Sequence, residues 1–237
     1  MLSINESTHG QALGSASVAK SAEMAERSRA EGVYHVSCVG PREEDRAAYI
    51  AVRDKIAALS KTSFNRLLNK RWLKTLQAKL DAFPLEPKWD EVVENVVTTV
   101  GKNLALDTYL AGSAYTVVGP YMGLINTNAS AAVIGDTMAS HAGWLEVGSA
   151  NAPAYTGPRK TCAWSAAGSG SKALSAALSF AITSSGTVGG CFIVFGTGAV
   201  STIDNTSGTL YSAGAFTGGS KTVANSDTLS VSYSTSL

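Results

Sequence analysis

The second half of this chain carries almost no charge, and this restricts its fold more than any other feature. Residues 104–237 contain four of the 19 Lys and Arg residues and five of the 18 Asp and Glu residues, so the first 103 residues contain the other 15 and 13. A soluble domain usually has about a quarter charged residues. The uncharged half consists largely of Ser, Thr, Gly, Ala and β-branched residues. This composition favours a β domain that packs against other chains, and it offers few of the acids, bases and ligands that an enzyme uses.

The properties of the whole chain argue against several classes of protein. The net charge of +1 provides no basic field for bulk nucleic-acid binding, so nucleic acid is not expected as a partner. No run of about 18 apolar residues occurs, so we expect no membrane span. Residues 1–20 lack the apolar core of a secretory signal. We therefore expect a protein that is made in the cytosol and kept or assembled there.

The cysteines and histidines give no sign of a metal site. Cys38, Cys162 and Cys191 are far apart, no C-x-x-C pair occurs, and His35 and His141 have no partner at metal-ligand spacing. Free cysteine behaves as a small buried hydrophobe. We expect three reduced cysteines used for packing, and neither a metal nor a cofactor.

The N-terminal part predicts an arm, a strand and a helix. Residues 1–31 are polar and small, without a core of their own, and we expect a neighbouring chain to order them. Val33–Val39 is rich in β-formers and is followed by Gly40 and Pro41, which predicts a strand that ends there. Acids follow Pro41, as at a helix start. One helical stripe then contains Tyr49, Val52, Ile56 and Leu59.

A second helix is predicted after Ser63, a candidate N-cap, and it is ended by Pro84 and Pro87. A short turn between two such helices predicts an antiparallel helical hairpin. The second helix is basic, which fits a solvated face, pairing with acids of the first helix, or contact with an acidic partner or nucleic acid. Trp72 is its one intervening aromatic, so base stacking has little support. The residues predicted to form an interface are Arg66, Lys70, Arg71 and Lys74.

The remaining sequence predicts a short helix and a series of strands. The clearest strand signal is residues 174–183, where apolar residues alternate with small polar ones. Gly189 and Gly190 suggest a bulge within the strand at 187–195. Strands separated by Gly, Ser and Asn turns predict an antiparallel β-sandwich of jelly-roll type. A helix is expected at 103–110, closed by Gly112, and the other strands at 89–100, 121–125, 144–147, 159–165, 209–216 and 229–234.

Catalytic constellations are weakly supported by the sequence. Asp136 and His141 with a serine would be a conceivable triad, but no G-x-S-x-G elbow and no placed base partner accompany them. Residues 168–172 contain glycines and a lysine but lack the spacing of a phosphate loop. We therefore predict that the protein is not an enzyme.

Six blocks of residues form a recognisable pattern in the chain: Glu94–Asn103, Leu106–Thr116, Tyr121–Ile125, Asp136–Trp144, Gly208–Gly214 and Asp227–Tyr233. Taken together, they resemble a family of bacteriophage virion proteins described as tail-fibre, head-fibre or decoration-type structural proteins. The resemblance covers roughly residues 88–237 and implies a virion protein, assembled in the host cytoplasm. It implies other virion proteins as partners, such as capsid, portal, tail or fibre subunits, together with copies of the chain itself.

The resemblance also bears on the domain organisation. In that family the strand like Val33–Val39 often runs almost directly into the strand like the one at 89–100, whereas here residues 41–87 intervene. We therefore expect an α+β chain with an extended N-terminal arm (1–31), a β-sandwich domain (32–40 and 88–237) and an inserted helical hairpin (41–87). The insertion is expected to dock this copy at a particular place on the particle.

Two functions remain open at this point. The first is a structural one, as a head- or tail-associated fibre, adaptor or decoration subunit. The alternative, implied by the resemblance to tail fibres, is a receptor-binding module that contacts host-surface glycans through exposed aromatic residues. Burial of these aromatics in interfaces favours the first function, and a solvent-facing aromatic groove favours the second. The candidate aromatics are Trp144, Tyr155, Trp164 and Tyr211.

Overall fold

A computed structural model describes residues 31–61, 66–109, 118–126, 132–141, 144–148 and 150–236. Three expectations lie outside this range: the arm up to residue 30, the N-cap at Ser63 and the helix end at Gly112. Glu31, expected to end the arm, is instead the first residue of a strand. The elements in chain order are β1 (Glu31–Pro41), α2 (Glu43–Lys61), α3 (Arg66–Asp81), β2 (Leu85–Val97), α4 (Thr99–Tyr109), β3 (Tyr121–Ile125), β4 (Lys160–Thr161), β5 (Ser171–Ala173), β6 (Leu178–Ala181), β7 (Gly186–Val188), β8 (Gly190–Phe195), β9 (Thr209–Ala215), β10 (Lys221–Val223) and β11 (Thr228–Ser236).

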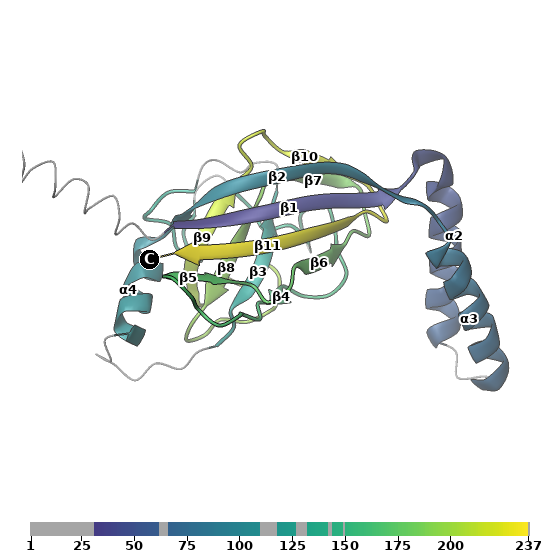
Figure 1. The fold of residues 1–237 in the computed structure, drawn as a ribbon, viewed down its shortest axis with the longest axis horizontal. Coiled ribbons are helices and arrows are strands. Elements are labelled where there is room, and N and C mark those ends of the chain that lie inside the picture. The colour runs from purple at the N-terminus through teal and green to yellow at the C-terminus, as the bar shows by residue number, and fades with distance from the viewer. Residues whose placement is uncertain are drawn as a thin grey trace, which may run out of the picture.

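Most of the strands belong to one antiparallel sheet that curves back on itself (Figure 1). Its nine strands follow the order β4-β3-β8-β9-β2-β1-β11-β5, and β6 also pairs with β11. A bridge between Trp164 and Leu174 joins the segment after β4 to the segment after β5, so the two edges of the sheet meet. The predicted combination of helices with an antiparallel β domain is confirmed. Its jelly-roll sandwich form stays a prediction, because the described strands form this sheet and a separate β7–β10 pair.

The curved sheet has apolar side chains on both of its faces around β8. Cys191 and Ile193 point into the inner core, which the sheet encloses. Phe192 and Val194 point the other way, into an outer core that also contains Met138. The alternation of strand side chains explains this division. The apolar run of β8 is continuous because both faces of the strand are covered.

The strand predicted most clearly from the sequence is interrupted. β5 and β6 both pair with β11, and between them residues 174–177 lie opposite only residues 232–233. Leu174 still donates its backbone N–H to the carbonyl of Tyr233, so the surplus residues after it must bulge out of the pairing. Of the predicted strand at 144–147, only a bridge between Ile125 and Glu146 is present. The short β10 was not expected.

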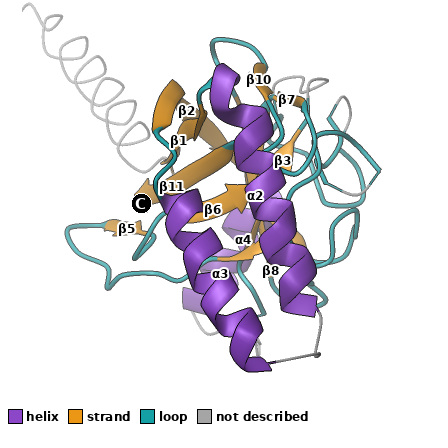
Figure 2. Cartoon of the chain, turned by 90° about the vertical axis from the view of Figure 1, so that its right-hand side faces the viewer, coloured by secondary structure: helices purple, strands orange, loops and turns teal. Residues whose placement is uncertain are grey.

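The helical pair α2–α3 lies between two strands that are paired with each other. β1 and β2 run antiparallel from Gly32 opposite Asn95 to Pro41 opposite Leu85. The helices therefore leave the β domain together, at one end of the curved sheet, and lie side by side across that end (Figures 1 and 2). At the other end, α4 begins earlier than expected because Thr98 caps it, its Oγ1 accepting a hydrogen bond of 3.1 Å from the N–H of Gly101.

The three cysteines are buried and have free thiols. Burial raises the pKa of the Cys38 and Cys162 thiols to about 12, and it raises the pKa of Cys191 as well. Only a thiolate reacts readily with thiol reagents. At about pH 8 we expect Ellman's reagent to label no cysteine of the native chain and all three after denaturation in urea. Rapid labelling of a native cysteine would contradict this assignment.

Candidate interaction surface

The helical hairpin is held to the β domain by two arginines of α2. The Nη1 of Arg46 donates to the Oδ1 of Asp227 at 3.0 Å and to the carbonyl of Asn225 at 2.6 Å. The second carboxylate oxygen of Asp227 accepts a hydrogen bond of 2.8 Å from the N–H of Ala224. About two turns further along α2, Arg53 donates to the Oγ of Ser226 at 2.8 Å. The base of the hairpin is therefore fixed against the turn that precedes β11.

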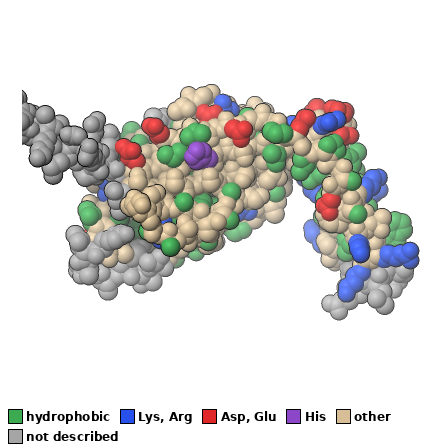
Figure 3. Space-filling view, viewed as in Figure 1, with side chains coloured by type: hydrophobic (Ala, Val, Ile, Leu, Met, Phe, Trp, Pro, Cys, Tyr) green, Lys and Arg blue, Asp and Glu red, His purple; other side chains and the backbone are tan. Residues whose placement is uncertain are grey.

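Beyond this anchor, the two helices mainly contact each other. The ring of Tyr49 meets the ring of Phe83 edge-on, at 5.6 Å between centroids. Among the described apolar side chains of α2 and α3, only Val52 is buried, at 7% exposure. Tyr49 of the predicted stripe on α2 thus contacts the segment that follows α3, but the pair of helices has little core of its own. In Figure 3 open space separates the far part of the hairpin from the β domain.

Charge on the hairpin is strongly polarised along its length. Residues 55–79 contain seven Lys and Arg residues and no Asp or Glu, whereas the acids Glu43, Glu44 and Asp45 lie at the base in the first turn of α2 (Figure 3). Among the described residues, the acids of α2 that form ion pairs do so with arginines of α2 itself, in the pairs Glu43–Arg46 and Asp54–Arg53. This favours an outside partner for the cations of α3.

The predicted interface residues lie on this basic part. Lys70, Arg71 and Lys74 are exposed on α3, and Arg66 is its first residue, although the side chain of Arg66 is outside the described set. Trp72 follows Arg71 in the sequence but lies on the opposite side of the helix from Lys70 and Lys74, with 62% of its surface exposed. Tryptophan and arginine are enriched among the residues that dominate binding energy at protein interfaces. The sequence had indicated the cations, but Trp72 was considered only for base stacking and its value as an anchor was missed.

The four candidate glycan-contacting aromatics do not form one surface. Trp144 and Tyr155 are buried, at 2% and 6% exposure, so these two candidates are not available to contact a glycan. Trp144 stacks on His141 with 3.7 Å between ring centroids, and Tyr155 packs edge-on against Phe180. The apolar surroundings of these rings explain why they are inside.

Trp164 and Tyr211, the other two candidates, are half-buried and border one small hollow of about 160 Å³. Trp164 packs edge-on against Tyr233, and Tyr211 packs edge-on against Phe195. Part of the surface of each ring is therefore already covered by a neighbouring ring. The two side chains do not present an open aromatic platform for a sugar.

Arg159 and Glu146 form a buried structural ion pair that the sequence did not reveal. Arg159 donates to both carboxylate oxygens of Glu146, at 2.8 and 2.6 Å, and also to the carbonyls of Val200 and Asn205. The N–H of Asp204 donates to the same carboxylate at 2.8 Å. Burial raises the pKa of Glu146 even though Arg159 opposes the shift. The pair joins three loop segments that are far apart in the sequence.

The residues of the conceivable triad also have structural partners. The Oδ2 of Asp136 accepts a hydrogen bond of 3.0 Å from the N–H of Val133. The Nδ1 of His141 lies 3.2 Å from the carbonyl oxygen of Trp144. Across the described part of the chain, no group of three or more His, Cys, Asp or Glu side chains is arranged to hold a metal ion.

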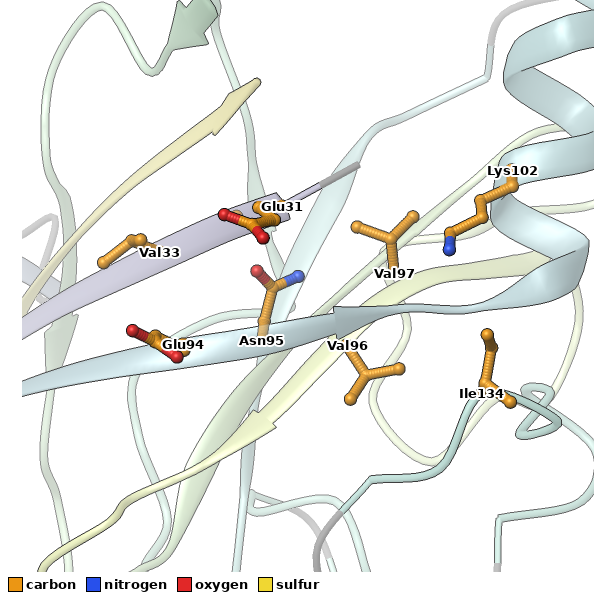
Figure 4. Close-up of a pocket in the computed structure, with 9 residues that line it drawn as sticks. Glu31, Val33, Glu94, Asn95, Val96, Val97, Lys102 and Ile134 are labelled. Atoms are coloured by element: carbon orange, nitrogen blue, oxygen red, sulfur yellow. The ribbon is translucent and has the colours of Figure 1, made fainter. Parts of the chain in front are cut away.

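A second candidate surface lies at the end of the β domain opposite the hairpin, around the start of β1 and the end of β2 (Figure 4). It is a hollow of about 360 Å³. Glu31 and Glu94 are exposed at its border, and Ile134 contributes an apolar wall that is 54% exposed. The Nδ2 of Asn95 donates to the hydroxyl of Tyr233 at 3.3 Å, but its Oδ1 is buried and has no hydrogen-bond partner. The other lining residues are Gly32, Val33, Val96, Val97 and Lys102.

Comparisons of the chain with protein families, with curated proteins and with solved structures each give no match. None of the helices in the described ranges is both long enough and apolar enough to cross a membrane. The functional argument therefore rests on the two surfaces at opposite ends of the molecule.

Proposed function

We propose that this chain is a non-enzymatic structural subunit of a bacteriophage particle, a head- or tail-associated fibre, adaptor or decoration protein. The observation that carries the proposal is the projecting helical hairpin, anchored at its base and exposing both Trp72 and the cations of α3. A jelly-roll sandwich, as expected from the sequence, would serve as the body that presents it. The resemblance over roughly residues 88–237 supplies the phage context.

The anchor supports a docking role for the hairpin. Arg46 and Arg53 fix the base of α2 on the β domain, so the exposed face of α3 has a defined direction before any partner arrives. A surface that is already in its bound geometry loses less entropy on association. Adaptors and decoration proteins need such a surface, because they must recognise one place on a preformed particle.

The buried polar groups support a structural role for the β domain. Glu146 and Arg159 satisfy each other and hold loop segments together, and Asp227 holds the hairpin. The glycan-binding alternative is not carried forward, because two of its four aromatics are buried in the cores and the other two are partly covered.

The proposal predicts that the chain is a component of purified phage particles and that α3 attaches it. In particles assembled with the Lys74→Glu variant, we expect the copy number of the chain to fall by about threefold or more, because reversal of an interface charge replaces attraction by repulsion. Lys172→Glu, which makes the same charge change on the exposed strand β5, is the matched control and should leave the copy number unchanged. Quantitative mass spectrometry of the particles measures both. If the chain is absent from purified particles, the proposed function is wrong.

A further inference from the structure

We propose that the helical hairpin of one copy docks into the hollow at the far end of a second copy, so that the protein associates head to tail. The occupant of the hollow would be the far part of the hairpin, with Trp72 inserted as the anchor. This inference rests on the proposed architectural role and adds a specific partner to it, a second copy of this chain.

The charges of the two surfaces are complementary. The hairpin presents seven Lys and Arg residues and no acid over residues 55–79. The hollow is bordered by Glu31 and Glu94, and the exposed Asp90 lies further along the same face of β2. Lys102 also lines the hollow, but in Figure 4 it lies beyond Val97, on the side away from the two glutamates. Complementary potentials of this kind steer association and fix its register.

The size and polarity of the hollow suit a tryptophan side chain. Pockets of about 300–1,000 Å³ accept drug-sized ligands, so a hollow of about 360 Å³ has room for an indole ring. Val33, Val96 and Ile134 provide apolar walls. Trp72 is the large apolar side chain with the highest exposure among the described residues, and its 62% exposed surface would be covered on docking.

The positions of the two surfaces decide the kind of assembly. The hairpin and the hollow lie at opposite ends of the same molecule (Figure 1). A contact between two different surfaces is heterologous, so each added copy leaves one hairpin and one hollow free. Such a contact produces a ring if the rotation closes and a filament if it does not.

Sedimentation velocity of the full-length purified chain over a range of concentrations tests the contact. We expect reversible association that weakens as the salt concentration rises, because exposed charges are screened. Trp72→Ala should weaken the association at least about tenfold, as expected for a binding hot spot. Leu145→Ala is the matched control, since Leu145 is also exposed (47%) but lies on neither surface, and it should have no effect. A wild-type chain that stays monomeric at all concentrations, or a Trp72→Ala variant that associates normally, overturns the proposal.

A charge exchange gives a second test that does not depend on loss of function alone. A hairpin variant with Lys70, Arg71, Lys74 and Lys79 all changed to Glu leaves three cations and four acids over residues 55–79. This variant and a hollow variant, Glu31→Arg with Glu94→Arg, should each fail to associate with itself. Mixed together, they should associate, because each hairpin then meets a hollow of opposite charge. Failure of the mixture to associate overturns the proposal, even if each variant alone is monomeric.

The chain's own N-terminal segment is the other candidate occupant of the hollow. Deletion of residues 1–30 tests which of the two binds there. Association that is abolished by the deletion would show that this segment makes the connection, and the head-to-tail contact of α3 would be wrong. Association that persists supports the proposal. The proposed virion role is judged separately, from the presence of the chain in purified particles, so a monomeric chain that is found in particles overturns this inference alone.

Discussion

The Arg159→Met variant is expected to unfold with a free energy about 3–5 kcal/mol lower than that of the wild type. Arg159 is fully buried, and its replacement would leave the carboxylate of Glu146, itself 6% exposed, without its ionic partner. The carbonyls of Val200 and Asn205 would also lose their donor. Because the pair connects three loop segments, the loss should reduce the stability of the whole β domain. Urea denaturation monitored by tryptophan fluorescence measures it.

The same variant should show a characteristic pH dependence. Burial already raises the pKa of Glu146, and removal of the arginine should raise that pKa further. A carboxyl group whose pKa is higher in the folded state than in the unfolded state binds protons preferentially in the folded state, so the stability of the variant relative to wild type should improve as the pH falls. We therefore expect a smaller stability loss at about pH 5 than at about pH 8.

Two further variants control this experiment. Arg42→Ala removes one partner of the exposed pair Arg42–Glu86, whose side chains are 52% and 48% exposed, and it should cost less than about 1 kcal/mol. The double variant Arg159→Met with Glu146→Gln should be more stable than Arg159→Met alone, because no unpaired charge remains buried. If Arg159→Met costs no more than Arg42→Ala, the pair does not have the role assigned to it.

The Asp227→Ala variant is expected to release the helical hairpin from the β domain and to lower the free energy of unfolding by about 3 kcal/mol. The side chain of Asp227 is 1% exposed, and it holds both Arg46 and the backbone N–H of Ala224. Its loss leaves Arg46, with a side chain only 11% exposed, without its buried partner. Hydrogen exchange should become faster throughout α2 and α3, whereas β8 in the core should keep its protection.

Glu43→Ala provides the matched control for this prediction, because Glu43 pairs with the same arginine from a side chain that is 82% exposed. We expect it to cost less than about 1 kcal/mol and to leave hydrogen exchange in α3 unchanged. Equal effects of the two variants, or unchanged protection of the helices in Asp227→Ala, would show that the hairpin is held in another way.

Much of the fold could be predicted from the sequence because it depends on local patterns. The helical stripe from Tyr49 to Leu59 and the strand Tyr121–Ile125 lie where they were expected. The break between β5 and β6 could not be predicted in this way. Alternation of polar and apolar residues indicates which side chains face water, but not where a neighbouring strand requires a bulge.

The candidate surfaces were predictable to different degrees. The cations of α3 are adjacent in sequence, so their clustering was visible without a structure. The hollow near Asn95 combines residues of β1, β2, α4 and the segment around Ile134, and no local pattern connects them. The Arg159–Glu146 pair was missed for a related reason, since side chains 13 residues apart on irregular segments have no periodicity that would bring them together. The sequence left the exposure of Trp144 and Tyr155 open, because composition alone does not separate exposed rings from buried ones.

The attachment of the hairpin to β1 and β2 has a mechanical consequence. Both strands run from the base of the hairpin to the opposite end of the β domain, and β1 is joined to β11 by nine consecutive residue pairs from Glu31 to Val39. Backbone hydrogen bonds between antiparallel strands lie perpendicular to the strand direction. A tensile force on the hairpin along the strands would therefore load these bonds in shear, all at once, instead of opening them one after another. Tension applied at one end of the molecule would be carried through the sheet to the other.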